Sequence, residues 1–196
     1  MIIDRLNGYK IILASRSPRR QQLMRDLGLK FDVVIKDYQE YYPEGLSGDE
    51  IARYVAFEKA ASFKNELIGN EIVIAADTIV WCNNKVLGKP LNRDDAAYIL
   101  NEISGKTHEV ITGVSLLSRS KEFTFSESTK VTFDIISEEE IYYYIDNFKP
   151  YDKAGAYGIQ EWIGLSACSF IEGSYFNVMG LPVQRLYKEL QKFVIE

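Results

Sequence analysis

The stretch Glu71–Cys82, EIVIAADTIVWC, decides the fold of this chain. It is almost continuous in apolar and β-branched residues, a pattern typical of a strand that is buried on both faces in the centre of a sheet. Asp77 interrupts this pattern with a carboxylate, which is costly to bury unless it meets a cation or a metal ion. An ion pair with a core Lys or Arg is the structural alternative to a catalytic role. The stretch therefore predicts a central strand and a charged partner for Asp77.

Cap and turn residues divide the rest of the chain into alternating strands and helices. Ser17 followed by Pro18 is a typical helix start, Gly28 is a typical helix stop, and Ser137 opens a capping box with Glu140. The expected strands cover residues 10–15, 31–35 and 71–82, and a long hairpin joins 107–118 to 123–136 through the turn 119–122. The expected helices cover residues 18–27, 48–63 and 93–103, and two more begin at 137 and 182. The glycine-rich region 149–180 fits no regular pattern.

This order of elements indicates an α/β fold with a mixed central sheet and flanking helices. The chain has 196 residues, of which 46% are apolar and 26% are charged, as is usual for globular proteins. A chain of this length can bury a core without disulfides or a structural metal. We therefore predict a single domain over residues 1–196.

Composition argues against several classes of protein. No run approaches the roughly 18 apolar residues of a membrane helix, and charges occupy the N-terminal stretch where a signal peptide would be apolar. We therefore expect a cytoplasmic protein with no membrane partner. The net charge of −5 argues against a nucleic-acid partner. With one histidine and two cysteines, Cys82 and Cys168, the usual zinc site cannot form, and we expect both thiols to be buried.

Two loops carry polar residues that a fold alone does not need. The loop 15–20, SRSPRR, leads from a predicted strand into a helix N-terminus, where unpaired backbone N–H groups and Arg side chains can bind an anion. A solvated basic helix turn is the alternative. The loop 152–160, DKAGAYGIQ, packs small residues where the backbone must approach something closely. His108, the single histidine, lacks a nucleophilic partner in any hydrolase motif, and we interpret it as a structural hydrogen-bonding residue.

These motifs together resemble those of the Maf family of nucleoside-triphosphate pyrophosphatases. The resemblance runs from Ile11 to about Tyr187, through LASRSPRR, DYQE, EKAA, AADTIV, LGKP, SGKTHEVITGV, DKAGAYGIQ and GSYFNVMGLP. A nine-residue leader before the first expected strand is a departure from the family pattern. It implies two lobes around a cleft, as in the related inosine-triphosphatase type, and a homodimer. It also implies a divalent metal, Mg²⁺ or Mn²⁺, as the cofactor.

The resemblance assigns roles residue by residue. The implied catalytic residues are Asp77 as the proton acceptor, Glu40, Lys59 and Lys89. The implied substrate-binding residues are Ser15, Arg19, Arg20, Thr78 and Gln160. The implied metal ligands are Glu40 and Asp77, whose hard oxygen atoms suit Mg²⁺. Arg19, Thr78 and Gln160 match the branch that hydrolyses dTTP and UTP.

The function implied is metal-dependent hydrolysis of pyrimidine nucleoside triphosphates to monophosphate and pyrophosphate. The expected substrates are dTTP and UTP, with CTP and modified nucleotides as further candidates. Two alternatives stay open: a nucleotide-binding regulator of cell division with incidental turnover, and a purine-directed house-cleaning pyrophosphatase. Two carboxylates, Glu40 and Asp77, argue against the regulator, because a pure binding protein gains nothing from negative charge beside a triphosphate.

Overall fold

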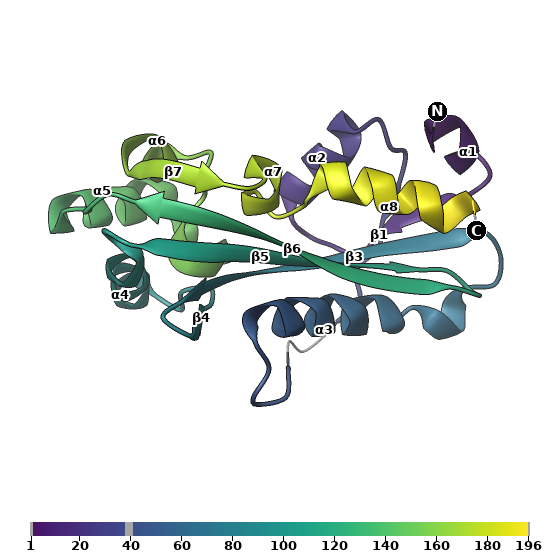
Figure 1. The fold of residues 1–196 in the computed structure, drawn as a ribbon, viewed down its shortest axis with the longest axis horizontal. Coiled ribbons are helices and arrows are strands. Elements are labelled where there is room, and N and C mark those ends of the chain that lie inside the picture. The colour runs from purple at the N-terminus through teal and green to yellow at the C-terminus, as the bar shows by residue number, and fades with distance from the viewer. Residues whose placement is uncertain (1, 38–40, 196) are drawn as a thin grey trace. The chain divides into compact units, whose positions relative to one another are not determined.

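The computed structural model describes residues 2–37 and 41–195 as a mixed α/β fold (Figure 1). The strands are β1 (Lys10–Leu13), β2 (Asp32–Val33), β3 (Glu71–Cys82), β4 (Lys85–Leu87), β5 (Thr107–Leu117), β6 (Glu122–Phe133) and β7 (Cys168–Glu172). The α-helices are α1 (Ile2–Leu6), α2 (Pro18–Asp26), α3 (Gly48–Ala61), α4 (Arg93–Ile103), α5 (Glu138–Phe148), α6 (Trp162–Ser166), α7 (Tyr175–Val178) and α8 (Val183–Ile195). Short 3-10 helices cover Lys64–Glu66, Pro150–Asp152 and Ala154–Ala156.

The strands form one mixed sheet in the order β2-β1-β3-β5-β6-β7, with β4 paired to β3. β1 runs parallel to both β2 and β3, whereas β4 is antiparallel to β3 and β7 is antiparallel to β6. The tight turn from β3 into β4 uses Asn83 and Asn84, both with positive φ, as a two-residue hairpin requires. The sheet confirms the predicted fold class, and β3 is the buried strand that its sequence predicts, with nine of its twelve residues buried.

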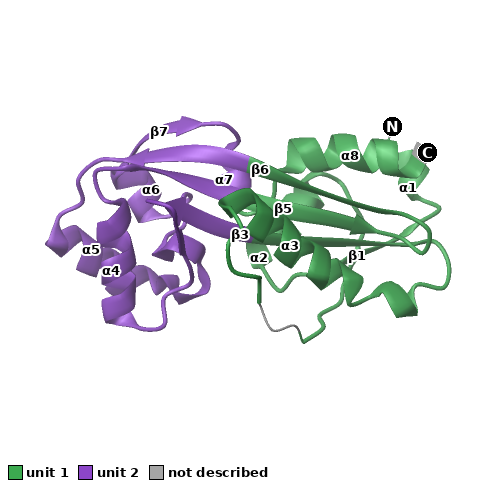
Figure 2. Ribbon diagram, turned by 60° about the horizontal axis from the view of Figure 1, so that its bottom comes forward, with its two compact units in different colours: residues 1–77, 112–127, 180–196 green, residues 78–111, 128–179 purple. Residues whose placement is uncertain are grey.

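The chain divides into two compact units (Figure 2). Unit 1 contains residues 1–77, 112–127 and 180–196, and unit 2 contains residues 78–111 and 128–179. Strands β3, β5 and β6 each pass from one unit into the other, so Asp77 ends a stretch of unit 1 and Thr78 begins unit 2.

In unit 1, α3 covers one face of the sheet and α1, α2 and α8 cover the other (Figure 1). The core under α3 consists of Ile12, Ala60, Phe63, Leu67, Val73, Ala75 and Leu117. Gly113 of β5 lets α3 come unusually close, because a Cβ atom at this position would lie 2.0 Å from the carbonyl oxygen of Ala52. Helix α3 therefore rests directly on the sheet backbone at this point.

In unit 2, α4 and α5 pack together over a second core that includes Phe133 and the fully buried Tyr144. Arg93 of α4 donates two hydrogen bonds to the carboxylate of Asp146 on α5, at 2.8 and 2.9 Å. These bonds lower the pKa of Asp146. The Arg93 guanidinium also lies 4.1 Å from the ring centroid of Tyr142. Each unit thus has a hydrophobic core of its own.

Most predicted elements appear with small shifts at their ends. The strand predicted over 31–35 is wrong in length, since β2 has two residues. It lies at the edge of the sheet that the described residues form, where β1 pairs with it on one side and the following residues Val34 and Ile35 are exposed. The region 149–180, which the sequence left unassigned, contains the edge strand β7 and four short helices: α6, α7 and the 3-10 helices Pro150–Asp152 and Ala154–Ala156. Cys82 is buried as predicted, but Cys168 on this edge strand is only partly buried.

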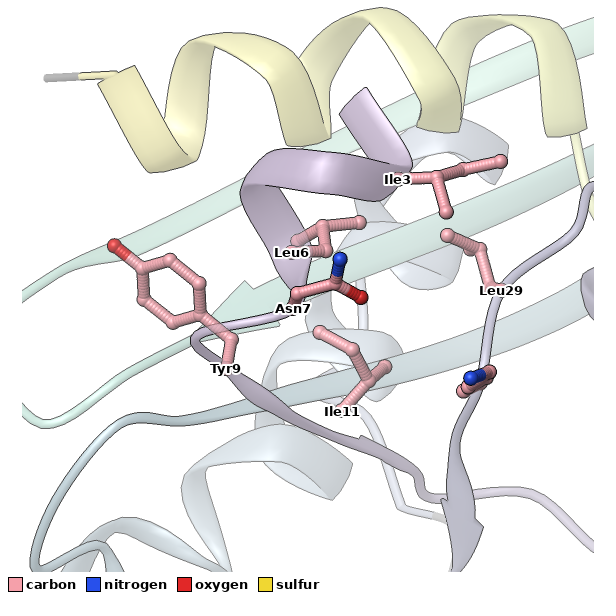
Figure 3. Close-up of a pocket in the computed structure, with 7 residues that line it drawn as sticks. Ile3, Leu6, Asn7, Tyr9, Ile11 and Leu29 are labelled. Carbon is pink, nitrogen blue, oxygen red and sulfur yellow. The ribbon is translucent and has the colours of Figure 1, made fainter. Parts of the chain in front are cut away.

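The leader before the first strand forms α1, which the sequence did not predict. Ile2 and Leu6 of this helix are buried, and Figure 3 shows α1 beneath α8, above the start of β1. A small pocket of about 120 Å³ remains beside it, lined by Ile3, Leu6, Asn7, Tyr9, Ile11, Leu29 and Lys30. The apolar face of a short helix is satisfied here by the tertiary packing rather than by its own helical propensity.

Within residues 2–37 and 41–195, no helix combines the length and apolar character that crossing a membrane requires.

We predict that Gly113→Ala lowers the free energy of unfolding by about 3 kcal/mol, because the added methyl group forces α3 away from β5. Chemical denaturation measures this change. Gly8→Ala is the matched control, since a Cβ atom at Gly8 meets nothing within 4 Å. Equal stability of the two variants would contradict the close contact.

We predict that His108 makes the protein less stable in acid. His108 is buried in β5 with its Nε2 atom 2.8 Å from the Tyr157 hydroxyl, as expected for a structural residue, and burial lowers its pKa from 6.5 to about 4. The unfolded chain therefore takes up a proton below pH 6.5, while the folded chain stays neutral until about pH 4. The resulting loss of stability over this window is up to about 3 kcal/mol. His108→Gln removes this contribution, so its stability relative to the wild type should rise from pH 7 to pH 4; a constant difference would contradict the assignment.

Candidate active site

The loop between β1 and α2 is built around two hydroxyl groups. Ser17 caps α2, its side chain accepting a hydrogen bond from the Arg20 amide, and Pro18 occupies the first helical position. Ser15 is buried, and its Oγ atom accepts hydrogen bonds from the Ser17 amide and from Nη1 of Arg20, both at 3.3 Å. The loop therefore has a defined conformation at the N-terminus of a nine-residue helix, where backbone N–H groups favour an anion.

Arg20 connects this loop to two other segments of unit 1. Its Nη1 atom donates to the carbonyl oxygen of Ala76 at 2.9 Å, and its Nε atom donates to that of Gly180 at 2.8 Å. The sequence predicted Arg20 as a phosphate-binding residue and had no signal for these backbone partners. The guanidinium holds the loop against β3 at the residue before Asp77. Arg19, next to it in the first turn of α2, is partly buried.

Asp77 meets the cation that its sequence context predicts. The Nζ atom of Lys59, on α3, lies 2.6 Å from Oδ1 of Asp77, and both side chains are less than one-fifth exposed. The structural alternative for Asp77, a Lys partner in the core, is therefore present, and that partner is itself one of the predicted catalytic residues. Unit 1 thus brings together four predicted residues: Ser15, Arg20, Lys59 and Asp77.

Three predicted residues belong to unit 2. Thr78 is partly buried in β3, whereas Lys89 and Gln160 are exposed in loops. The segments that carry these three residues meet at Gly155. The Gly155 amide donates to the carbonyl oxygen of Gly88 at 3.0 Å, and a Cβ atom at Gly155 would lie 2.6 Å from the side chain of Val80.

Glu40 lies outside the described residues, so one of the two predicted metal ligands has no position here. Among residues 2–37 and 41–195, no three His, Cys, Asp or Glu side chains gather in a way that could hold a metal ion. Asp77 is the one predicted ligand in this part of the chain.

The structure also reveals a buried network that sequence analysis did not predict. Lys153 is 7% exposed and forms an ion pair with Glu161, on the other side of Gln160. Lys153 belongs to the DKAGAYGIQ motif and Glu161 directly follows it, but no pattern in the sequence indicates that the two residues pair. Trp162, the next residue, packs the edge of its ring against Tyr143 of α5.

Comparison with known proteins places the chain in a family. The family model described as Maf-like protein matches residues 10–193. The dTTP/UTP pyrophosphatase of Phocaeicola vulgatus is 54% identical over 192 residues, which cover 97% of this chain and 100% of that protein. The dTTP/UTP pyrophosphatase of Flavobacterium johnsoniae is 51% identical over 194 residues, covering 99% of this chain and 100% of that protein.

Among solved structures, the Staphylococcus aureus Ham1 protein matches with a TM-score of 0.47 and 14% identity, covering 63% of this chain and 71% of that chain. The family match rests on the sequences instead. The motifs that build the loop at Ser15, the Lys59–Asp77 pair and the segment around Gln160 all lie within residues 10–193, and over that span the chain belongs to the Maf family.

Proposed function

We propose that this chain hydrolyses dTTP and UTP to the nucleoside monophosphate and pyrophosphate. Relatives named dTTP/UTP pyrophosphatase, identical at half or more of the aligned positions over nearly the whole chain, support this assignment. The observation that carries it is the series of contacts in unit 1. Arg20 bonds both Ser15 and the carbonyl oxygen of Ala76, and the next residue, Asp77, is paired with Lys59.

The first requirement of the reaction is to hold a substrate with about four negative charges. The N-terminus of α2 offers backbone N–H groups to a phosphate, and Arg19 and Lys59 add positive charge from side chains. Arg20 contributes its charge while its donors keep the loop in place. Lys89, in unit 2, is a fourth cation for the departing pyrophosphate. Such charges stabilise the negative charge that develops on the leaving group.

The second requirement is a base for the attacking water. In the proposed step, the water oxygen attacks the α-phosphorus, the bond from this atom to the bridging oxygen breaks, and pyrophosphate leaves. Asp77 accepts the proton that the water loses. Lys59, with its Nζ atom 2.6 Å from Oδ1, forms an ion pair with this carboxylate and fixes its orientation.

We also propose a divalent cation, Mg²⁺ or Mn²⁺, with Asp77 and Glu40 as its protein ligands. The donor set is compatible with Mg²⁺, which commonly binds one or two carboxylates together with substrate phosphates and water molecules. Asp77, buried beside one cation and offering hard oxygen atoms, suits this mode of binding better than a site made entirely of protein ligands. When bound, the divalent cation would neutralise part of the negative charge of the substrate phosphates.

Base selection is proposed for Gln160 and Thr78. Uracil and thymine present an N–H donor between carbonyl acceptors, and a Gln side-chain amide can pair with a donor and an acceptor at once. Cytosine presents the opposite order, so CTP should be a poorer substrate, and a purine must fit a second ring. The exposed side chain of Gln160 is available for such pairing. The homodimer, the cleft between two lobes and the cytoplasmic location stay predictions.

We predict that Asp77→Asn lowers kcat for UTP by about 10²-fold or more, because the amide cannot accept the proton. Thermal unfolding shows whether the variant is folded, and ³¹P NMR identifies the product as pyrophosphate or orthophosphate. Asp32→Asn is the control, since Asp32 belongs to an exposed Lys–Asp pair with Lys10.

Near wild-type turnover in a folded Asp77→Asn variant would show that the Asp77–Lys59 pair is purely structural. Release of orthophosphate by the wild type would indicate attack at the γ-phosphorus and a different class of enzyme. Tight nucleotide binding without turnover would favour the regulator.

We predict the order UTP and dTTP above CTP, and CTP above GTP, for kcat/KM of the wild type measured with Mg²⁺ or Mn²⁺. Gln160→Ala should lower kcat/KM for UTP about 10-fold more than for CTP, since a paired hydrogen bond is lost. Gln22→Ala is the control, because Gln22 is exposed and bonds Asp26 within α2. GTP hydrolysis as fast as UTP hydrolysis would support the purine-directed alternative, and an unchanged UTP-to-CTP ratio in Gln160→Ala would show that this residue does not contact the base.

A further inference from the structure

Lys153 is a buried cation that the proposed mechanism does not use. Its side chain is 8% exposed, and its Nζ atom lies 2.7 Å from Oδ1 of Asp152 and 3.2 Å from Oε1 of Glu161. The Asp152 side chain is mostly exposed at 60%, whereas that of Glu161 is 20% exposed. Glu161 is therefore the less exposed of these two partners of Lys153.

Glu161 is held from its other side by Tyr144 of α5. The Tyr144 hydroxyl donates to Oε2 of Glu161 and accepts a hydrogen bond from the Gly158 amide at 3.0 Å. Each oxygen of the carboxylate thus has a partner, Lys153 on one and the fully buried Tyr144 on the other. A side chain at Gly158 would displace the Glu161 carboxylate, because a Cβ atom there would lie 2.8 Å from Cδ of Glu161.

These contacts enclose a four-residue turn that carries Gln160. The Glu161 amide donates to the carbonyl oxygen of Gly158 at 3.0 Å, which makes Ile159 and Gln160 the central residues of the turn. Ile159 is buried, and its carbonyl oxygen lies so close to Gly164 that a Cβ atom there would approach to 1.8 Å. Gln160 alone among residues 155–160 is exposed. The backbone of Gln160 is therefore held on both sides, while its side chain is exposed.

The stability of the fold is a weak reason for burying the Lys153–Glu161 ion pair. Replacing a buried ion pair by apolar residues of similar size is often neutral or stabilising, whereas an ion pair fixes one geometry of the chain. A side chain that must distinguish uracil from cytosine needs its amide held in place by its supporting residues. The buried pair lies directly under the turn that carries such an amide.

We propose that Lys153, through its ion pair with Glu161, is a positioning residue for base selection: it holds the turn 158–161 so that Gln160 meets the pyrimidine in one orientation. This inference rests on the function proposed above. Lys153 does not contact the base; it acts through Glu161 and the turn.

The test compares kcat/KM for UTP and CTP in Lys153→Met, which keeps the length of the side chain and removes its charge. We expect the UTP-to-CTP ratio to fall by about 5- to 10-fold, close to its value in Gln160→Ala. Adding Gln160→Ala to Lys153→Met should change the ratio by less than about 2-fold, because both substitutions remove one function. Lys130→Met is the matched control: Lys130 belongs to an exposed ion pair with Glu172 in the same unit and should leave the ratio unchanged.

Two further variants provide the test if Lys153→Met fails to fold. Glu161→Gln keeps a partner for Tyr144 and loses the ion pair, and the double variant Lys153→Met/Glu161→Gln leaves no buried charge unpaired. Both should narrow the UTP-to-CTP ratio as Lys153→Met does. Hydrogen exchange supplies a readout apart from activity, since the Gly158 and Glu161 amides should exchange at least about 10-fold faster in these variants.

The outcomes separate this inference from the proposed function. If folded variants lose activity equally toward UTP and CTP, or keep the wild-type ratio, Lys153 is structural and the inference is wrong while the function stands. If the wild type and Lys130→Met do not release pyrophosphate from UTP or dTTP, the proposed function is wrong, and accelerated exchange at Gly158 in Lys153→Met would still show what the ion pair does to the turn.

Discussion

The ion pair between Lys59 and Asp77 is the constraint on which the architecture of unit 1 depends. A carboxylate in a strand with both faces buried is stable only beside a cation, so the helix that carries Lys59 must cross the sheet at that residue. The same helix also lies close to β5, where Gly113 leaves room for the Ala52 carbonyl group. Two contacts thus hold α3 against the sheet: the ion pair with Asp77 in β3 and the close approach at Gly113 in β5.

Arg20 connects the loop after β1 to β3, at the residue before Asp77. A guanidinium offers donors in several directions, and Arg20 uses them for a serine hydroxyl group and for two carbonyl oxygens that belong to distant segments. The loop, the residue before Asp77 and the segment before α8 therefore have fixed positions relative to one another within unit 1. A site for a polyanion gains from this rigidity, because groups already in place need not be ordered when the ligand binds.

Unit 2 uses ion pairs in two different ways. Arg93 and Asp146 join α4 to α5 with about half of each side chain exposed, so solvent weakens their contribution to stability. Lys153 and Glu161 are mostly buried beneath a turn whose neighbouring residues are also buried. A buried pair with every oxygen bonded is rigid, since breaking it would leave a charge without solvent. The exposed pair, Arg93–Asp146, lies on the surface of two helices, whereas the buried pair, Lys153–Glu161, lies beside the turn that carries Gln160.

The sequence by itself determined most of the helices and strands, because their causes are local. Apolar patterning predicted β3, the Asn92 cap placed the start of α4, and the Ser137 capping box placed the start of α5. The cost of burying Asp77 predicted a charged partner, though local pattern could not say which one. Only the tertiary structure decided that Lys59 is this partner, that Arg20 bonds the carbonyl groups of Ala76 and Gly180, and that Lys153 pairs with Glu161. The physical reason is that backbone carbonyl groups have no sequence signature, and a pairing across space depends on how separate elements pack. The shortness of β2 and the docking of α1 depend on packing in the same way, since an edge strand and a five-residue helix are stabilised by their neighbours rather than by their own sequences.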